Sequence, residues 1–336
     1  MTSPHTAMRT AFIGVSHWHL PLYLEPALAA PGILVTAVSD PDPVVVQRVA
    51  AQAGAAGWQD WREMIERERP DFIFVLGRHC DMAEVARALI DRGIPFAIEK
   101  PCGIDGREVT DLANRARAAG AFAAVPFVLR DSRMMQTIRE VAAGEQVKYL
   151  SFKFVGGSVD RYRQAGCNWM LDRRTSGGGC LLNLGVHFLD LARLLFTDPP
   201  VVAGALISNA VDGLNTEDHA AVLLRAGAGA CLIETGYIYP APHMRFDLHF
   251  SIRTEHHYFA AKDSEALEVL TTAQARSVHA MGMTNVPYYP HFVRDVVARA
   301  ARGDRLVADM SDMQAVMSLV EAAYAASPIP ERKGDH

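Results

Sequence analysis

The order of apolar and polar positions divides the chain into two parts. In the first part, short apolar runs alternate with stretches of helical spacing. Strands are expected at residues 9–15, 33–39, 71–76, 95–99 and 121–125, and helices at 20–30, 43–53, 60–68, 81–91 and 105–119. Apolar strands that alternate with helices are typical of a parallel sheet covered on both faces. Because such crossovers are right-handed, this part predicts a doubly wound, Rossmann-like α/β domain.

The pattern changes after about residue 127. Elements expected there are a strand at 147–155, a long helix at 178–196, several longer strands between about 200 and 272, and two closing helices at 290–302 and 311–326. In residues 245–252, apolar Phe246, Leu248, Phe250 and Ile252 alternate with Arg245, Asp247, His249 and Ser251. This alternation predicts an antiparallel strand with one apolar face. We therefore expect two domains, residues 8–127 and 128–330, with the closing helices free to pack back on the first.

Composition excludes several classes of function. The net charge of −5 gives no electrostatic reason to expect nucleic acid, and no run of about 18 apolar residues predicts a membrane span. The five cysteines are scattered, with no CxxC pair, which fits a reduced, cytoplasmic protein. His17 and His19, like His256 and His257, lack a cysteine or carboxylate cluster at ligand spacing, so no metal is expected.

The first expected strand runs into the turn from Gly14 to His19. A dinucleotide-binding domain carries GxGxxG here, which lets a diphosphate approach the backbone. Only the first glycine is present, because Ser16 and His19 take the second and third positions. Serine is small enough for the second position, whereas His19 is expected to loosen the packing of helix against strand. An ordinary polar turn is the alternative interpretation.

Asp40 ends the second expected strand, 21 residues after His19. An acidic residue there can bind both ribose hydroxyls of NAD and repel the extra phosphate of NADP. Pro41 follows it, with no adjacent arginine for a 2′-phosphate. The sequence thus favours NAD over NADP; the alternative is a solvated turn.

Two further motifs carry groups suited to proton transfer. Lys100 ends the fourth expected strand within Glu99-Lys100-Pro101, at the sheet edge where ligands bind, although a surface lysine is the alternative. After Gly177-Gly178-Gly179, Asn183 and His187 lie four residues apart on the expected helix. A histidine with a near-neutral pKa can accept a hydroxyl proton, while a structural, hydrogen-bonded histidine is the alternative.

Taken together, the degraded glycine turn, Asp40, EKP and GGGxLxNxGxH resemble the glucose–fructose oxidoreductase, inositol dehydrogenase and rhizopine-catabolism family, written Gfo/Idh/MocA. The resemblance spans almost the whole chain. It implies a Rossmann domain followed by an α/β domain with an open, mainly antiparallel sheet. It also implies NAD(P)-dependent chemistry on sugars, cyclitols or glycosides, with Lys100 and His187 flanking the reacting carbon.

The chain departs from the family pattern at four places. The glycine turn is degraded, and Asn183 replaces an aspartate and cannot supply its charge. Gly77-Arg78-His79 replaces the family's TPN along the cofactor, with Met82 in place of a later histidine. His17 and Trp18 are bulky and are expected to crowd the same cleft. These departures indicate a divergent subfamily.

The resemblance also supplies pocket and partner assignments. The loop with Trp169, Asp172, Arg173 and Arg174 is expected to line the substrate pocket, and Arg130 is a further candidate. The cofactor-binding residues expected are Gly14, Ser16, His17, Trp18, Asp40, Gly77, Arg78, His79, Glu99 and Lys100. A homo-oligomer is expected, because exposed apolar strand faces tend to be covered. Two alternatives to a dehydrogenase remain: elimination assisted by transient oxidation with bound NAD, and a non-catalytic dinucleotide-binding regulator.

Overall fold

The computed structural model describes residues 7–240 and 246–329, which form two compact units. The first unit contains the chain up to Pro126 together with Ala165–Trp169 and Tyr288–Gln314. The second contains Phe127–Gln164, Met170–Pro287 and the chain from Ala315 onward. A short loop segment and the helix α10 (Tyr289–Arg302) therefore belong to the first unit although they lie far along the sequence.

The first unit is built on a six-stranded parallel sheet in the order β3-β2-β1-β4-β5-β6. Its strands are β1 (Met8–Ile13), β2 (Ile33–Ser39), β3 (Ala56–Trp58), β4 (Phe72–Val75), β5 (Phe96–Ile98) and β6 (Ala123–Ala124). The helices between them are α1 (Leu20–Ala29), α2 (Pro43–Ala53), α3 (Trp61–Glu68), α4 (His79–Arg92) and α5 (Gly106–Ala119). Every residue of β4 is buried, as expected where helices cover both faces. The predicted doubly wound domain is confirmed.

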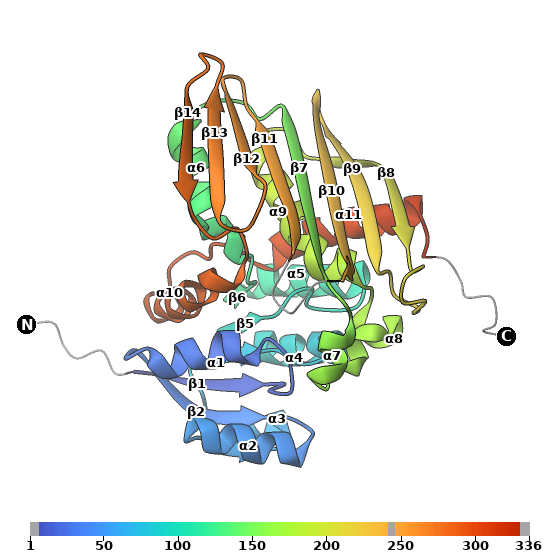
Figure 1. The fold of residues 1–336 in the computed structure, drawn as a ribbon. Helices are drawn as coiled ribbons and strands as arrows, with labels where there is room; N and C mark the ends of the chain where they lie inside the picture. Colours follow the sequence, from blue (N-terminus) through green and yellow to red (C-terminus); the bar gives the residue numbers. More distant parts are fainter. Residues whose placement is uncertain (1–6, 241–245, 330–336) are drawn as a thin grey trace, which may run out of the picture. The chain divides into compact units, whose positions relative to one another are not determined.

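The second unit is built on an eight-stranded mixed sheet in the order β14-β13-β12-β11-β7-β10-β9-β8 (Figure 1). Only β7 and β10 pair in parallel; the other pairs are antiparallel. The strands are β7 (Tyr149–Gly157), β8 (Val201–Ser208), β9 (His219–Ala226), β10 (Gly229–Tyr239), β11 (Asp247–Arg253), β12 (His257–Ala261), β13 (Ala266–Thr271) and β14 (Arg276–Ala280). The open, mainly antiparallel sheet is confirmed.

The remaining helical segments lie before, between and after these strands along the sequence. They are η1 (Val128–Asp131), α6 (Arg133–Val141), α7 (Asp160–Gln164), η2 (Asn168–Leu171), α8 (Arg173–Ser176), η3 (Leu181–Gly185), α9 (Val186–Leu195), η4 (Val286–Tyr288) and α11 (Met310–Ala326). Three of them, η2, η4 and α11, contain residues of both units. The stretch Arg173–Leu195 is long and apolar enough to cross a membrane by length and composition alone, but 78% of its apolar window is buried inside the protein. Core helices pass the same test.

Several predicted details differ in the structure, and the strands β3 and β14 lie outside the expected ones. The expected helix at 178–196 is not one regular α-helix, because it begins with the π-helical turn η3. In β11 the apolar Leu248, Phe250 and Ile252 are buried and His249 is exposed, but Ser251 is buried too. The polar face of that strand is therefore only partly open to solvent; Arg245 lies outside the described residues.

Candidate active site and cofactor pocket

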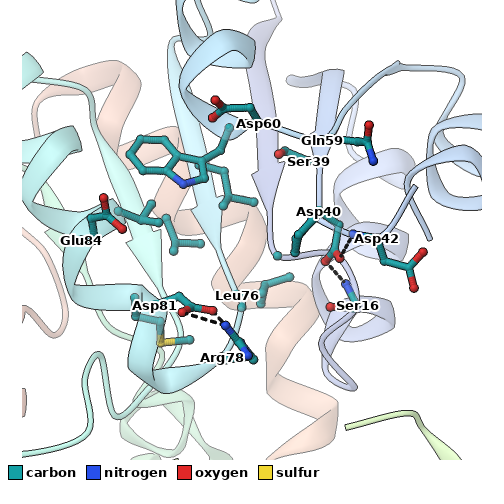
Figure 2. Close-up of a pocket in the computed structure, with 18 of the residues that line it drawn as sticks. Ser16, Ser39, Asp40, Asp42, Gln59, Asp60, Leu76, Arg78, Asp81 and Glu84 are labelled. Carbon is teal, nitrogen blue, oxygen red and sulfur yellow. Dashed lines mark hydrogen bonds and ion pairs between the residues drawn. The ribbon is translucent and has the colours of Figure 1, made fainter. Parts of the chain in front are cut away.

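A pocket of about 740 Å³ opens at the carboxyl ends of β1, β2 and β4 in the first unit (Figure 2). Ligands of open α/β sheets bind at this edge. The lining residues include Gly14, Ser16, Asp40, Asp42, Gln59, Asp60, Trp61, Arg62, Gly77, Arg78, Asp81, Met82, Glu84 and Trp169. Five of the expected cofactor residues thus share one pocket: Gly14, Ser16, Asp40, Gly77 and Arg78.

The turn after β1 needs glycine at Gly14. Its φ is +77°, and a Cβ there would lie 2.2 Å from the backbone nitrogen of Gly77, which follows β4. Two neighbouring strand ends therefore meet backbone to backbone at the pocket floor. A side chain at residue 14 would separate them, which explains why this glycine is kept while the other two are not.

Asp40 is buried rather than solvated, with 2% of its surface exposed. Its carboxylate accepts hydrogen bonds from the backbone nitrogens of Ser16, at 2.8 Å, and Asp42, at 3.1 Å. The solvated-turn interpretation of Asp40 is therefore wrong, because the protein desolvates the carboxylate and fixes it at the pocket wall. Asp40 also closes the turn itself, a role that the sequence did not indicate.

The glutamate of EKP lies at the centre of a buried hydrogen-bond network. Glu99 is 1% exposed, and its Oε1 accepts from His19 Nδ1 at 2.7 Å and from the Tyr23 hydroxyl at 2.8 Å. Its Oε2 accepts from the backbone nitrogen of Lys100 at 3.0 Å. Burial would raise the pKa of Glu99, but the charge and hydrogen bond of His19, with Lys100 and His17 nearby, hold it well below its usual range. The carboxylate is therefore ionised and fixes the peptide that carries Lys100.

This network changes two interpretations. Lys100 is 3% exposed, so it is not a surface lysine. His19 does not loosen the helix joint, because its ring fills the space above Glu99 and is itself buried. Glu99, expected to bind the cofactor, is buried, and its Oε2 accepts a hydrogen bond from the backbone nitrogen of Lys100. Tyr23 was missed; its position one helical turn after His19 was the available signal.

His17 and Trp18 pack together with aromatic rings from other parts of the first unit. The His17 ring lies 6.2 Å from Trp18 and 5.6 Å from Trp169, and Trp169 lies 4.9 Å from His79. Burial, with the charge of His19, lowers the pKa of His17 well below its ordinary value, so His17 is neutral. His17 and His79 are buried, and Trp169 lines the pocket beside them. His17 and Trp18 therefore belong to an aromatic cluster that includes the pocket-lining Trp169.

In the second unit, Asn183 lies on the π-helical turn η3. Its amide nitrogen donates to the hydroxyls of Tyr162, at 2.7 Å, and Tyr237, at 2.9 Å. The Arg161 guanidinium lies over both phenol rings, 4.8 and 4.9 Å from their centroids. Asn183 thus lies on the π turn and His187 on the α-helix that follows it, and the Asn183 amide nitrogen is held by two tyrosines. π turns are frequent at functional sites.

Glu217 holds the start of that helix. Its carboxylate accepts from the backbone nitrogens of Gly179, at 2.8 Å, and Leu181, at 2.9 Å, and from the Tyr324 hydroxyl at 2.9 Å. A Cβ at Gly179 would lie 2.0 Å from the Glu217 carbonyl oxygen. The glycine run is therefore required for this close approach, and Glu217 was not found from sequence because it lies on a distant loop.

His187, on α9, is 5% exposed and lies edge-on to Phe127, with ring centroids 6.2 Å apart. It lines a small cavity of about 20 Å³ with Leu129, Phe154 and Met283. Arg130, expected to bind substrate, forms a buried two-pronged ion pair with Asp190, with distances of 2.6 and 2.8 Å. This ion pair links η1 to α9.

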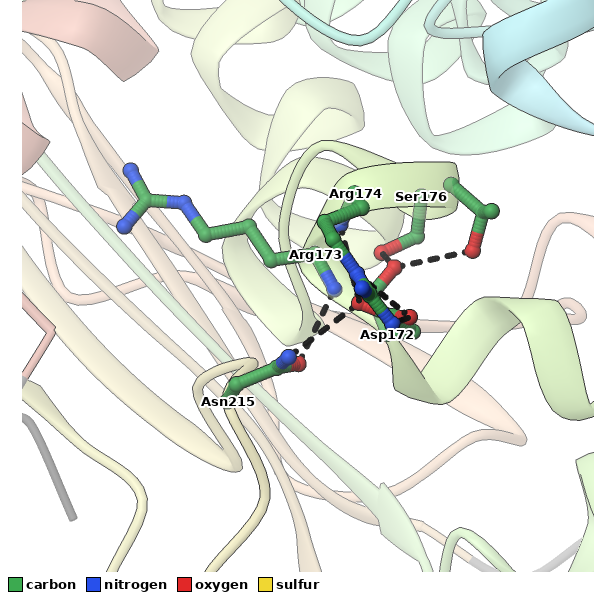
Figure 3. Close-up of polar contacts among 6 residues, drawn as sticks. Asp172, Arg173, Arg174, Ser176 and Asn215 are labelled. Carbon is green, nitrogen blue, oxygen red and sulfur yellow. Dashed lines mark hydrogen bonds and ion pairs between the residues drawn. The ribbon is translucent and has the colours of Figure 1, made fainter. Parts of the chain in front are cut away.

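The loop before the triple glycine is organised by Asp172. Its carboxylate accepts from the Arg174 guanidinium, at 2.7 Å, and from Asn215, while its backbone oxygen accepts from Ser176 (Figure 3). Asp172 also caps the short helix α8. The strong hydrogen bonds from Arg174 lower the pKa of Asp172 well below its usual value. Asp172 and Trp169 fall in different units, although the sequence placed them in one loop.

Among residues 7–240 and 246–329, no group of three or more His, Cys, Asp or Glu side chains could hold a metal ion. The five cysteines are all free.

Two parts of the chain match known protein families. Residues 8–127 match the family described as "Oxidoreductase family, NAD-binding Rossmann fold", and residues 141–255 match the GFO/IDH/MocA C-terminal domain. The chain belongs to the Gfo/Idh/MocA family. Its first unit is therefore the NAD-binding domain of this oxidoreductase family, as the sequence predicted.

Individual relatives are distant in sequence. The D-glucoside 3-dehydrogenase of Escherichia coli strain K12 is 23% identical over 202 residues, 60% of this chain, and the match spans only 57% of that enzyme's length. An oxidoreductase from Agrobacterium radiobacter, solved with NAD⁺, L-tartaric acid and magnesium, aligns over 96% of both chains with a TM-score of 0.84 and 17% identity. A levoglucosan dehydrogenase, solved with NADH and levoglucosan, covers 96% of this chain and 98% of its own, with a TM-score of 0.82 and 16% identity. These two structures show the shared fold.

Proposed function

We propose that the protein is an NAD-dependent dehydrogenase or reductase that acts on a secondary alcohol or the matching ketone of a sugar, cyclitol or glycoside. Family membership supports the oxidoreductase class. Two similar proteins, the D-glucoside 3-dehydrogenase and the levoglucosan dehydrogenase, act on carbohydrates by name. The observation that carries the proposal is Lys100, which is held after β5 by a buried, ionised Glu99.

The pocket of the first unit fits a dinucleotide. Gly14 and Gly77 leave a floor without side chains, and the fixed Asp40 carboxylate offers acceptors for ribose hydroxyls. NAD would lie there and supply the hydride acceptor or donor. Because Asp40 is a buried anion, a 2′-phosphate beside it is disfavoured, which supports NAD over NADP.

Lys100 and His187 divide the proton chemistry in this proposal. The ammonium of Lys100 stabilises negative charge on the reacting oxygen, and His187 accepts the hydroxyl proton during oxidation and returns it during reduction. Asn183 serves as a positioning residue, because its amide nitrogen bonds Tyr162 and Tyr237. Arg130 and Asp172 remain candidate substrate contacts, although each forms an ion pair within the protein, with Asp190 and Arg174 respectively. Trp169 contributes an aromatic face to the NAD pocket.

The test is formation of reduced nicotinamide when the protein is mixed with NAD and a panel of sugars, cyclitols, glycosides and sugar acids. A dehydrogenase gives stoichiometric absorbance with at least one substrate. An eliminating enzyme instead consumes a glycoside with no net NADH, and a regulator binds NAD but converts nothing. Either of the last two results would refute the proposal.

We also propose that the protein works in the cytoplasm as a homo-oligomer. The free cysteines fit a reducing compartment. On the outer side of the second sheet, Leu206 and Leu223 are 60% and 51% exposed. An apolar surface of this kind is stabilised when another subunit covers it.

A further inference from the structure

The backbone of the turn after β1 has few amides to offer a ligand. Amides in such a turn normally bind the diphosphate of a dinucleotide. Here four consecutive N–H groups already donate within the protein: Gly14 N and Val15 N to the Ser39 carbonyl at 2.8 and 3.4 Å, Ser16 N to Asp40 Oδ2 at 2.8 Å, and His17 N to the Gly14 carbonyl at 3.2 Å.

The amides at the start of α1 also donate within the protein. The His19 amide donates to His17 Nδ1 at 3.1 Å, and the Leu20 amide donates to the His17 carbonyl at 2.9 Å. The next residue is Pro21, which has no N–H group. Side chains must therefore supply much of the recognition that amides usually give.

Two cations line the pocket among its described residues, Arg62 and Arg78. Arg62 lies over the Trp61 ring, 4.1 Å from its centroid, and bonds Glu84. Arg78 directly follows Gly77, whose backbone touches Gly14, so its side chain begins beside the turn. Figure 2 shows Arg78 and Ser16 at the same end of the pocket.

We propose that the Arg78 guanidinium, with the exposed Ser16 hydroxyl, binds the diphosphate of the dinucleotide in place of backbone amides. The proposal rests on the proposed use of NAD. The guanidinium fork matches two oxygens of a phosphate, which a point charge does not. Without ligand the fork is aligned by Asp81, with Nε to Oδ2 at 2.7 Å and Nη2 to Oδ1 at 3.1 Å.

The pair with Asp81 is half-exposed on both sides, with 50% and 49% of the side chains accessible. Such pairs contribute little stability, so phosphate oxygens can replace the Asp81 oxygens at small cost. The surrounding pocket carries the carboxylates of Asp40, Asp42 and Asp81. A diphosphate therefore meets mostly negative groups there, and loss of the lining cation that follows Gly77 should be costly.

The experiment compares binding of NADH, ADP and adenosine to the full-length protein by calorimetry or fluorescence. Arg78→Ala should weaken NADH and ADP about 10- to 100-fold, as expected for charged hydrogen bonds, and leave adenosine within about twofold. Arg78→Lys should restore only part of the loss, because it keeps charge without the fork. Asp81→Asn should strengthen ADP binding, because it removes a competing anion.

Arg87→Ala is the matched control, since Arg87 lies on α4, the helix that Arg78 precedes, but pairs with Asp111 and does not line the pocket. It should leave all three affinities unchanged. Equal NADH binding by the wild type and Arg78→Ala would overturn the Arg78 proposal while leaving NAD use intact. An equal loss of affinity for adenosine and for ADP in Arg78→Ala would overturn it too. A wild type that binds neither NADH nor ADP would overturn the proposed function as well.

Discussion

Replacing Glu99 by glutamine tests whether the buried network holds Lys100. The two side chains have nearly the same shape, so packing is preserved. Glutamine can keep Oε1 as an acceptor for His19 and Tyr23. Its amide nitrogen must then take the place of Oε2 and face the backbone N–H of Lys100. Both groups are hydrogen-bond donors, so this hydrogen bond is lost.

The expected cost follows from these contacts. The variant loses one hydrogen bond to a charged group, about 1.5–3 kcal/mol, and leaves a buried donor unsatisfied, about 1–3 kcal/mol. Because these contributions overlap, a loss of about 2–4 kcal/mol in the stability of the first unit is expected. For a unit of this size that corresponds to a fall in Tm on the order of 5–15 °C.

The stability lost in Glu99→Gln should decrease as the pH falls. The pKa of Glu99 is depressed in the folded protein by His19 and Lys100, in spite of burial. A carboxylate with a lowered folded pKa contributes stability that is complete above its unfolded pKa, about 4.3, and declines as pH falls below it. The difference between wild type and Glu99→Gln should therefore be full near pH 7 and narrow below about pH 4.

The assay is thermal unfolding of the NAD-free protein across this pH range, followed by steady-state kinetics on an identified substrate. Glu66→Gln is the control, since Glu66 is 68% exposed and its ion pair with Arg92, at 3.4 Å, lies at the surface. Such exposed pairs contribute little stability. At neutral pH we expect kcat to fall with little change in the KM for NAD. An unchanged Tm together with an unchanged kcat would refute the role assigned to Glu99.

Three further predictions concern other positions. Asp40→Ala should narrow the preference for NAD over NADP, checked by titrating both cofactors; tighter NADP binding by the wild type would contradict the assignment. Lys100→Met should lower turnover about 10²–10⁴-fold with little loss of NADH affinity, measured by kinetics and direct binding. Leu206→Glu should shift the protein to a smaller species in light scattering, because a charge on an apolar interface is costly to bury; an unchanged mass would place any interface elsewhere.

Most of the fold could be predicted because the pattern of the chain is strong and local. The apolar strands β1, β2 and β4 alternate with helices that begin at side-chain caps such as Asp42 and Asp60. The π turn at Leu181–Gly185 was not predicted, and its first amide is held by Glu217, 36 residues from Leu181 along the chain. No local pattern reports a hydrogen bond to a distant loop.

The sequence suggested candidate site residues but not the residues that hold them. Asp40, Lys100 and His187 were proposed from strand ends and motif spacing, which can be read directly from the sequence. The partners Tyr23, Tyr162 and Tyr237 were not, since a tyrosine inside an apolar stripe looks like core. Asn183 was singled out from its place in the motif, whereas the tyrosines that its amide nitrogen bonds come from α7 and β10.

The degraded glycine turn is best understood as a coordinated set of replacements. His19, in the position of the third glycine, fills the helix joint and holds Glu99, which in turn fixes the Lys100 peptide. Ser16, in the position of the second, gives its amide to Asp40 and leaves its hydroxyl in the pocket. Because the amides of the turn donate within the protein, few of them can bind a diphosphate, and a cation beside the turn can take their place. Arg78 occupies this position, where the family often has proline. Each departure from the pattern thus makes physical sense only together with the others, and the same residues that weaken the motif in the sequence connect the cofactor pocket to the lysine proposed to carry the chemistry.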